Sequence, residues 1–247
     1  DDSFLLVKED AWLEEFCRQY RDRIGLPFFC KAIPRWVTQE RIRLLQQAGL
    51  EQIEIGLEAN ERVNREVFHR RQSDAAFVAA ARVLEEAGIV RHYDVILHNP
   101  YMTEQDLVCT AEILLSLRKP FSVNYYPLTF FPGTALHERA AEDGIPHAEP
   151  DEVRWDKPVA GLPSNYQHFT RVFFLIPFLP AGVLRHFLRH PNSWWGRAGL
   201  ATISVSYLSV LQRLMRMLKR KPWLYYRIIK PLYRAADRLG GARQNPA

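Results

Sequence analysis

Stretches with helical hydrophobic spacing alternate with short apolar runs along the first 145 residues. In one stretch, Phe77, Ala80, Ala81 and Leu84 recur at the spacing that buries one face of a helix. The whole pattern predicts helices over 11–23, 39–48, 75–87, 104–117 and 136–142. It predicts strands over 27–30, 52–57, 93–97 and 122–131.

Residues at the ends of these segments support the predicted boundaries. Three helices pass into an apolar run through a glycine such as Gly49, which takes the left-handed conformation of a helix C-terminus at little cost. Thr38 is expected to cap the second helix, and Ser73 or Asp74 the third, because short oxygen-bearing side chains satisfy the free N–H groups there. The predicted helices and strands are therefore separate elements.

Strict alternation of strands and helices is typical of βαβ units and a parallel sheet. Either a doubly wound open sheet or part of a (β/α) barrel fits this order. In both, ligand-binding groups lie where the strands end. The opening DDSFLL is interpreted as the polar end of one further strand, which makes Asp1 and Asp2 candidates as well.

Polar side chains follow each predicted strand at the end where such sites form. A convergent set of this kind suits a small polar ligand with hydroxyls and a charged amine. The strand-end residues are Asp1, Asp2, Lys31, Glu58, Asn60, His98, Asn99 and Thr129.

Several common chemistries lack their motifs. The sequence has no G-x-x-x-x-G-K-[ST], G-x-G-x-x-G, H-E-x-x-H or G-x-S-x-G pattern. Cys17, Cys30 and Cys109 lie far apart without C-x-x-C spacing, so they are interpreted as reduced packing thiols and no metal ligands are assigned. Catalytic residues are not identified. No export signal is recognised, which predicts a cytoplasmic protein.

Charge divides the chain into two different parts. The net charge of +5 combines −9 up to Asp156 with +14 from Lys157 onward. We expect a domain over 1–145, a proline-rich linker over 146–170, and a basic, aromatic-rich helical region over 171–247. The apolar stretch 172–184 is too short and too interrupted by proline to span a bilayer.

The basic region leaves three interpretations open. Its helices are expected to be apolar on one face and rich in Arg and Lys on the other. They suit a cap over the first domain, or peripheral contact of 171–234 with anionic lipid at the inner face of the membrane. Nucleic-acid binding is the third and least supported interpretation, because no recognised motif accompanies the basic and aromatic residues.

An ordered set of segments resembles the radical S-adenosylmethionine (SAM) enzymes, in the branch that often carries a cobalamin-binding domain. The resemblance covers 1–144. The segments are DDSFLL, PFFCKAIP, LLQQAGLEQIEIGLEA, NREVFHRRQS, YDVILHNPYMTEQDL and LTFFPGTAL.

The resemblance implies a partial (β/α)6 TIM-like barrel that lacks its first strand. It implies SAM, a four-iron four-sulfur cluster and, in some members, cobalamin as cofactors, together with a reductant protein. Asp1 and Asp2 match positions near the methionine part of SAM, and Glu58 and Asn60 match positions near its ribose. The remaining cofactor-binding candidates are Lys31, Arg70, at a basic position of the family, and Asn99, at the end of the fifth strand.

Two departures from the family pattern qualify this prediction. No CxxxCxxC loop is present, so the cluster ligands are expected outside this chain, which we interpret as a fragment that is inactive alone. Ala59-Asn60 replaces the family's usual Ser-Gly. The predicted function is radical or cobalamin-dependent chemistry by the longer enzyme on a small-molecule or lipophilic substrate. The alternative is a non-enzymatic nucleotide-binding or membrane-attached interaction module.

Overall fold

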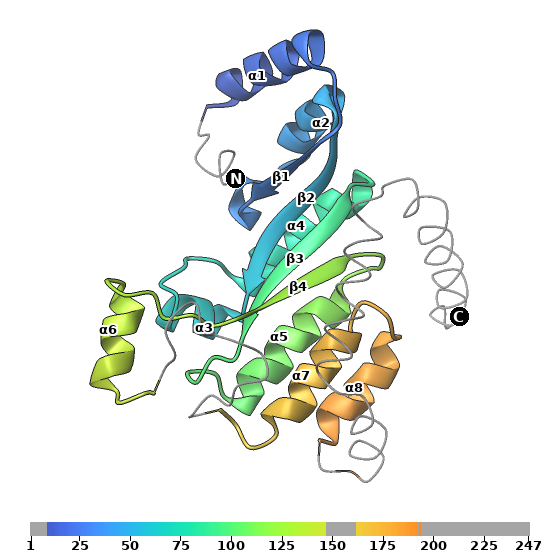
Figure 1. Ribbon diagram of the computed structural model, residues 1–247. Helices are drawn as coiled ribbons and strands as arrows, with labels where there is room; N and C mark the ends of the chain where they lie inside the picture. The colour runs from blue at the N-terminus through green and yellow to red at the C-terminus, as the bar shows by residue number, and fades with distance from the viewer. Residues whose placement is uncertain (1–8, 147–161, 192, 194–247) are drawn as a thin grey trace. The chain divides into compact units, whose positions relative to one another are not determined.

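The computed structural model describes residues 9–146, 162–191 and 193. These residues form two compact units (Figure 1). Unit 1 contains the chain up to Leu97 together with 121–128. Unit 2 contains 98–120 and the described residues from Thr129 onward. Asp1 and Asp2 lie outside the described residues.

Unit 1 contains a four-stranded sheet in which every neighbouring pair is parallel. The strand order is β1-β2-β3-β4, so each strand pairs with the next one along the chain. A doubly wound sheet instead reverses its strand order at a switch point. The described sheet therefore confirms the α/β prediction and has the sequential order of a (β/α) barrel. The strands are β1 (Phe28–Ala32), β2 (Leu50–Glu58), β3 (Val90–Leu97) and β4 (Ser122–Pro127).

The helices of unit 1 follow the predicted positions closely. They are α1 (Asp10–Arg23), α2 (Gln39–Ala48), α3 (Glu61–Glu66) and α4 (Asp74–Glu86), with a 3-10 turn η2 (Pro34–Trp36). Thr38 and Ser73 cap α2 and α4 as expected, each accepting a backbone hydrogen bond. Gly49 ends α2 with a φ of 114°, in the left-handed region. The sequence pattern missed α3 and η2, which are short.

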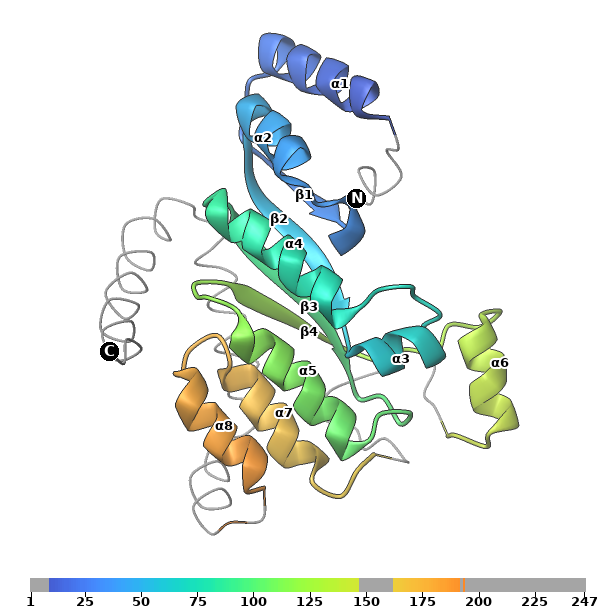
Figure 2. The same ribbon diagram turned by 180° about the vertical axis from the view of Figure 1, so that it is seen from behind.

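One face of the sheet is apolar and lies against α2 and α4 (Figure 2). Ile53, Ile55 and Tyr93 on this face are fully buried. The ring of Phe77 from α4 meets Tyr93 edge-on at 5.2 Å between centroids. Because the predicted helical stripe of α4 is buried here, the main core of unit 1 lies between α4 and the middle strands.

Unit 2 is helical in its described residues. It contains α5 (Glu104–Ser116), α6 (Ala135–Glu142), α7 (Tyr166–Leu175) and α8 (Ala181–Arg189). Arg185 of α8 donates to Glu112 of α5 at 2.8 Å. The hydroxyl of Tyr166 accepts the backbone N–H of His98 at 2.5 Å. These contacts join α8 to α5, and α7 to the segment that follows β3.

The predictions for the end of β4, the linker and the basic region compare with the structure as follows. Strand β4 ends at Pro127 instead of residue 131, because its partner strand β3 ends at Leu97, the register partner of Pro127. Helix α7 begins at Tyr166, within the range taken as linker, while the three-part domain division stays a prediction. Among the described helices none is long and apolar enough to cross a membrane. Most of the basic region, 194–247, lies outside the described residues.

Candidate functional site

The second face of the sheet in unit 1 is polar, although parallel sheets usually carry apolar residues on both faces. Side chains in register across four strands share this face, because alternate residues of a strand point the same way. We call it the polar face; its residues are Lys31, Glu54, His92, Asp94, Ser122 and Asn124. Polar groups in place of apolar packing mark this face as the candidate site.

Hydrogen bonds and one ion pair link these side chains across the strands. The Lys31 ammonium lies 3.1 Å from Oε1 of Glu54. The Asn124 amide donates from Nδ2 to Oε2 of Glu54 and to Oδ1 of Asp94, at 2.9 Å each. His92 contacts Ser122 through Nδ1 at 2.5 Å. The polar face therefore holds two carboxyl groups and one ammonium group within one hydrogen-bonded network.

Glu58 lies at the carboxyl end of β2 with a φ of 61°, which is uncommon for a residue other than glycine. Its carboxylate forms an ion pair with Arg70. Gln72 donates to the carbonyl of Gly56 at 3.1 Å, so the segment after α3 folds back onto the end of β2. Burial raises the pKa of Glu58, and Arg70 opposes that rise.

Gly56 makes room for the Glu58 side chain. A Cβ at position 56 would overlap the Glu58 carboxylate and lie 2.9 Å from its Cδ. The carboxylate therefore folds back over the polar face, next to Asp94, whose register partner is Gly56.

Gly56→Ala is expected to displace the Glu58 carboxylate and weaken its pairing with Arg70. Overpacking at this position should lower the free energy of unfolding by about 1–3 kcal/mol, measured by urea denaturation. Gly182→Ala is the matched control, because a Cβ there meets no atom within 4 Å. Equal stability of the Gly56→Ala variant and the wild type would contradict this assignment.

Asn60 has a local structural role that the sequence analysis did not assign. Its side chain accepts the Val63 N–H at 3.4 Å and caps α3. Asn64, on the same helix, donates to the carbonyls of Leu57 and Ala59 at 2.9 and 2.7 Å. These bonds hold the turn between β2 and α3. The predicted ribose contact of Asn60 stays a prediction.

The structure brings together some of the predicted residues. Lys31, Glu58 and Arg70 belong to unit 1 and lie on or beside the polar face. Asn99 belongs to unit 2, where it is fully buried and accepts the Tyr101 N–H at 2.9 Å. The structure describes neither Asp1 nor Asp2, so their predicted role is untested.

Sequence reasoning missed Glu54, Asp94 and Asn124, which lie inside strands instead of at strand ends. The sequence did contain a signal for them. In each strand a charged or amide residue alternates with apolar residues, which is the pattern of a strand with one polar face. In QIEIGLE, for example, Glu54 stands between two buried isoleucines.

The cysteines do not form a metal site in the described residues. Cys17 and Cys30 are buried, and burial raises the pKa of their thiols to about 11 and about 12. No group of three or more His, Cys, Asp or Glu side chains suited to a metal ion occurs in the described part of the chain. The four-iron four-sulfur cluster implied by the resemblance therefore does not fit the residues present.

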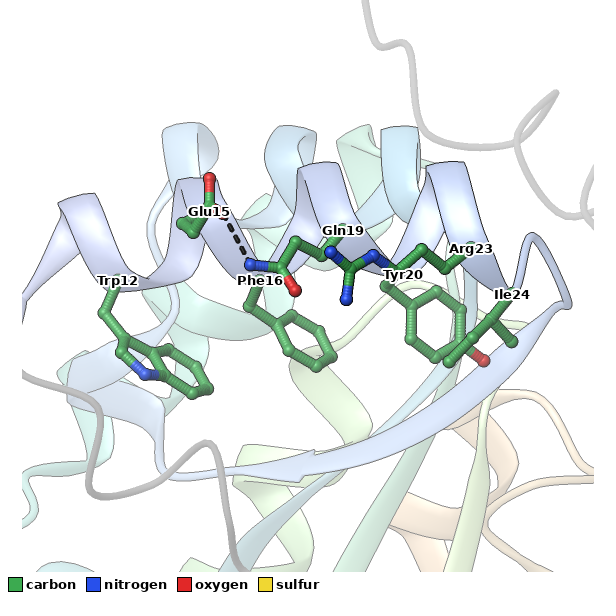
Figure 3. A pocket seen from close by; sticks show the side chains of 7 residues that line it. All are labelled: Trp12, Glu15, Phe16, Gln19, Tyr20, Arg23 and Ile24. Carbon is green, nitrogen blue, oxygen red and sulfur yellow. Dashed lines mark hydrogen bonds between the residues drawn. The ribbon is translucent and has the colours of Figure 1, made fainter.

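A separate hollow of about 400 Å³ lies along α1 in unit 1 (Figure 3). Trp12 and Phe16 stack at 5.5 Å between ring centroids, and Tyr20 continues the row one turn later. Hydrogen bonds from Arg18 and Gln19 lower the pKa of the neighbouring Glu15 to about 2. None of the predicted site residues lines this hollow. Its lining residues are Trp12, Glu15, Phe16, Gln19, Tyr20, Arg23 and Ile24.

No protein-family model and no curated protein matches the sequence. Solved structures resemble parts of it. Elp3 from the archaeon Methanocaldococcus infernus, with an N-terminal deletion, matches at 18% identity over 48% of this chain and 28% of that chain, with a TM-score of 0.42. The radical SAM methyltransferase TsrM from Kitasatospora setae, with cobalamin and a [4Fe-4S] cluster bound, matches at 17% identity over 54% and 27%, with a TM-score of 0.47.

Coproporphyrinogen III oxidase (HemN) from Escherichia coli, a radical SAM enzyme, matches at 17% identity over 50% of this chain and 30% of that chain, with a TM-score of 0.42. This chain thus spans less than a third of each of these three proteins. Because the TM-scores are below 0.5 and the identities below 20%, the functional proposal depends on the residues of the chain itself.

Proposed function

We propose that the polar face of unit 1 binds SAM as part of a radical SAM enzyme. The observation that carries the proposal is a set of two ion pairs, one on the polar face and one at the carboxyl end of β2, the end at which a parallel βα sheet places its ligands. Glu58 and Arg70 form one pair, and Lys31 and Glu54 form the other. The sequence resemblance supports the same assignment.

The charged groups suit the parts of SAM. The Glu58 carboxylate can accept hydrogen bonds from ribose hydroxyls, and the Arg70 guanidinium can pair with the ligand's carboxylate. Glu54 and Glu58 favour its ammonium and sulfonium charges. When bound, SAM would supply a methyl or 5′-deoxyadenosyl group to the chemistry. The residues of this chain would bind and orient it.

The iron–sulfur cluster would have to be held by residues from outside this chain. Cys17 and Cys30 are buried with raised thiol pKa values, which disfavours the thiolate that metals need. We therefore assign no cluster ligand and derive no step through the cluster. Cobalamin, a reductant protein, a lipophilic substrate, membrane contact and cytoplasmic location remain sequence-based predictions.

The poor fit to the cluster favours a second candidate function. The same polar face could serve a non-enzymatic domain that binds a nucleoside-like ligand. Such a domain should bind S-adenosylhomocysteine as well as SAM and should need no cluster from any partner. A longer chain with a CxxxCxxC loop, reconstituted with iron and sulfide, should cleave SAM under reducing conditions only if the enzymatic proposal is correct.

Glu58→Gln is expected to weaken SAM binding by about tenfold or more, because a hydrogen bond to a charged group contributes about 1.5–3 kcal/mol. The substitution keeps the volume of the side chain and removes its charge. Binding is measured by isothermal titration calorimetry. Glu61→Gln, in the exposed first turn of α3, is the control and should bind as the wild type does. Equal affinity of Glu58→Gln and wild type, or no binding by either, would refute the proposed site.

A further inference from the structure

Three carboxyl groups and two cationic side chains lie together on the polar face. Lys31 pairs with Glu54, and Arg70 pairs with Glu58. Asp94 has no ion-pair partner among the residues that the structure describes. It instead accepts a hydrogen bond from the Asn124 amide. The charges balance only if one carboxyl group carries a proton.

Glu54 and Asp94 are the neighbouring carboxyl groups between which that proton can be shared. One amide nitrogen, Nδ2 of Asn124, lies 2.9 Å from an oxygen of each carboxyl group. The two groups are therefore adjacent, and Glu54 is only 8% exposed. Two ionised carboxylates this close in a partly dry site repel each other strongly, so one of them stays protonated.

We propose that Glu54 and Asp94 share one proton at neutral pH and exchange it with a basic nitrogen of a ligand on the polar face. We call Glu54 and Asp94 the proton-sharing pair. The inference rests on the proposed function in one respect: it assumes that the ligand binds on the polar face. The proposed function uses Glu54 only as a negative charge near SAM and does not use Asp94; the role inferred here for the two residues together is acid–base exchange with an amine-bearing ligand.

The exchange is balanced in atoms and charge. The O–H bond of the Asp94 carboxyl breaks, and a new N–H bond forms on the ligand amine. Asp94 becomes a carboxylate and the amine an ammonium, with no electron transfer. An ammonium that binds from solution displaces the same proton to water. In both cases the total charge of the site is unchanged, so the exchange avoids burying an additional charge.

The groups around Asp94 set its protonation. Burial is the largest influence on the pKa of Asp94; Glu54 and Glu58 also raise it and Asn124 opposes the rise, and together these groups bring the pKa to about 8. Lys31 on β1 and Arg70 after α3 are the cations of the cluster, and His92 lies on the same strand as Asp94. His92 is engaged with Ser122 and Gln52.

The test is a carbon-13 NMR titration of aspartate carboxyl groups in the whole chain, with Asp94→Asn used to assign the signal. The Asp94 signal is expected to change near pH 8. Glu54→Gln should lower its midpoint because the neighbouring charge is lost, whereas Lys31→Met should raise it because a cation is lost. Arg35→Met, which removes an exposed cation on η2, should leave the midpoint unchanged. A midpoint near pH 4 in the wild type would overturn the proposal.

Ligand exchange is tested in the same titration with methylammonium chloride as the probe. Methylammonium should lower the Asp94 midpoint by half a unit or more, and Glu54→Gln should reduce that shift. Tetramethylammonium has the same charge but no N–H to donate and should cause no shift. Equal responses to the two ions, or no response to either, would overturn the exchange. If the chain binds SAM but the Asp94 midpoint is not near pH 8, only this inference is wrong. If the Asp94 midpoint is near pH 8 but the chain does not bind SAM, only the proposed function is wrong.

Discussion

Asp94→Asn is expected to stabilise the chain at pH 8 by about 3 kcal/mol while leaving its stability at pH 4 nearly unchanged. Burial and the adjacent Glu54 raise the pKa of Asp94 from 3.8 to about 8 in the folded chain. Between these values the folded chain keeps a proton that the unfolded chain has lost. The free energy of unfolding therefore falls as pH rises through this window, by up to about 1.4 kcal/mol per pH unit.

Asparagine removes this dependence because it resembles the protonated carboxyl group and does not titrate. Its amide can still donate to Glu54 and accept from Asn124. The expected gain is smaller than the full pKa shift implies, because part of the polar face is hydrated.

Urea denaturation at pH 4, 6 and 8 measures the effect. Asp22→Asn, at an exposed position on α1, is the control and should change stability by less than about 0.5 kcal/mol at each pH. If Asp94→Asn and the wild type lose stability in parallel between pH 4 and 8, Asp94 is not the protonated group.

Phe77→Ala is expected to lower the free energy of unfolding of unit 1 by about 3–5 kcal/mol. Phe77 is fully buried and its ring meets Tyr93 edge-on on the apolar face. The substitution removes apolar contacts and leaves a cavity between α4 and β3, which close-packed neighbours can fill only in part.

The loss should appear as a lower urea midpoint with an unchanged dependence on urea concentration. Phe131→Ala is the control, since that ring is 57% exposed, and should change stability by less than about 0.5 kcal/mol. A loss below about 1 kcal/mol for Phe77→Ala would show that α4 does not form the main core of unit 1.

Local signals predicted most of the elements that carry the site. The boundaries of α2 were predicted to the residue, because Thr38 and Gly49 act through their nearest neighbours. The burial of Phe77, Ala80, Ala81 and Leu84 followed from helical spacing alone. The strand at β3 was predicted three residues short, since His92 and Arg91 interrupt its apolar pattern. Their partners come from elsewhere in the fold: neighbouring strands supply those of His92, and Glu85 on α4 pairs with Arg91.

The candidate site could be predicted only in part. Lys31 and Glu58 were found because strand ends are fixed by chain order in a βα fold, and Arg70 was found through the family resemblance. Glu54 and Asp94 were not found, because the residues that contact their carboxyl groups are distant in the sequence and no neighbouring residue indicates a role for them. Asn124 is 70 residues from Glu54 and 30 from Asp94 in the sequence, yet its amide contacts both.

By itself, then, the sequence determined the alternating βα elements, their caps and the polar strand ends, since each depends on residues within a few positions. Only the tertiary structure decided the sequential strand order, the polar face and the pairing of its charges. Register between strands sets which distant side chains become neighbours, and the pKa of Asp94 depends on that proximity and on burial.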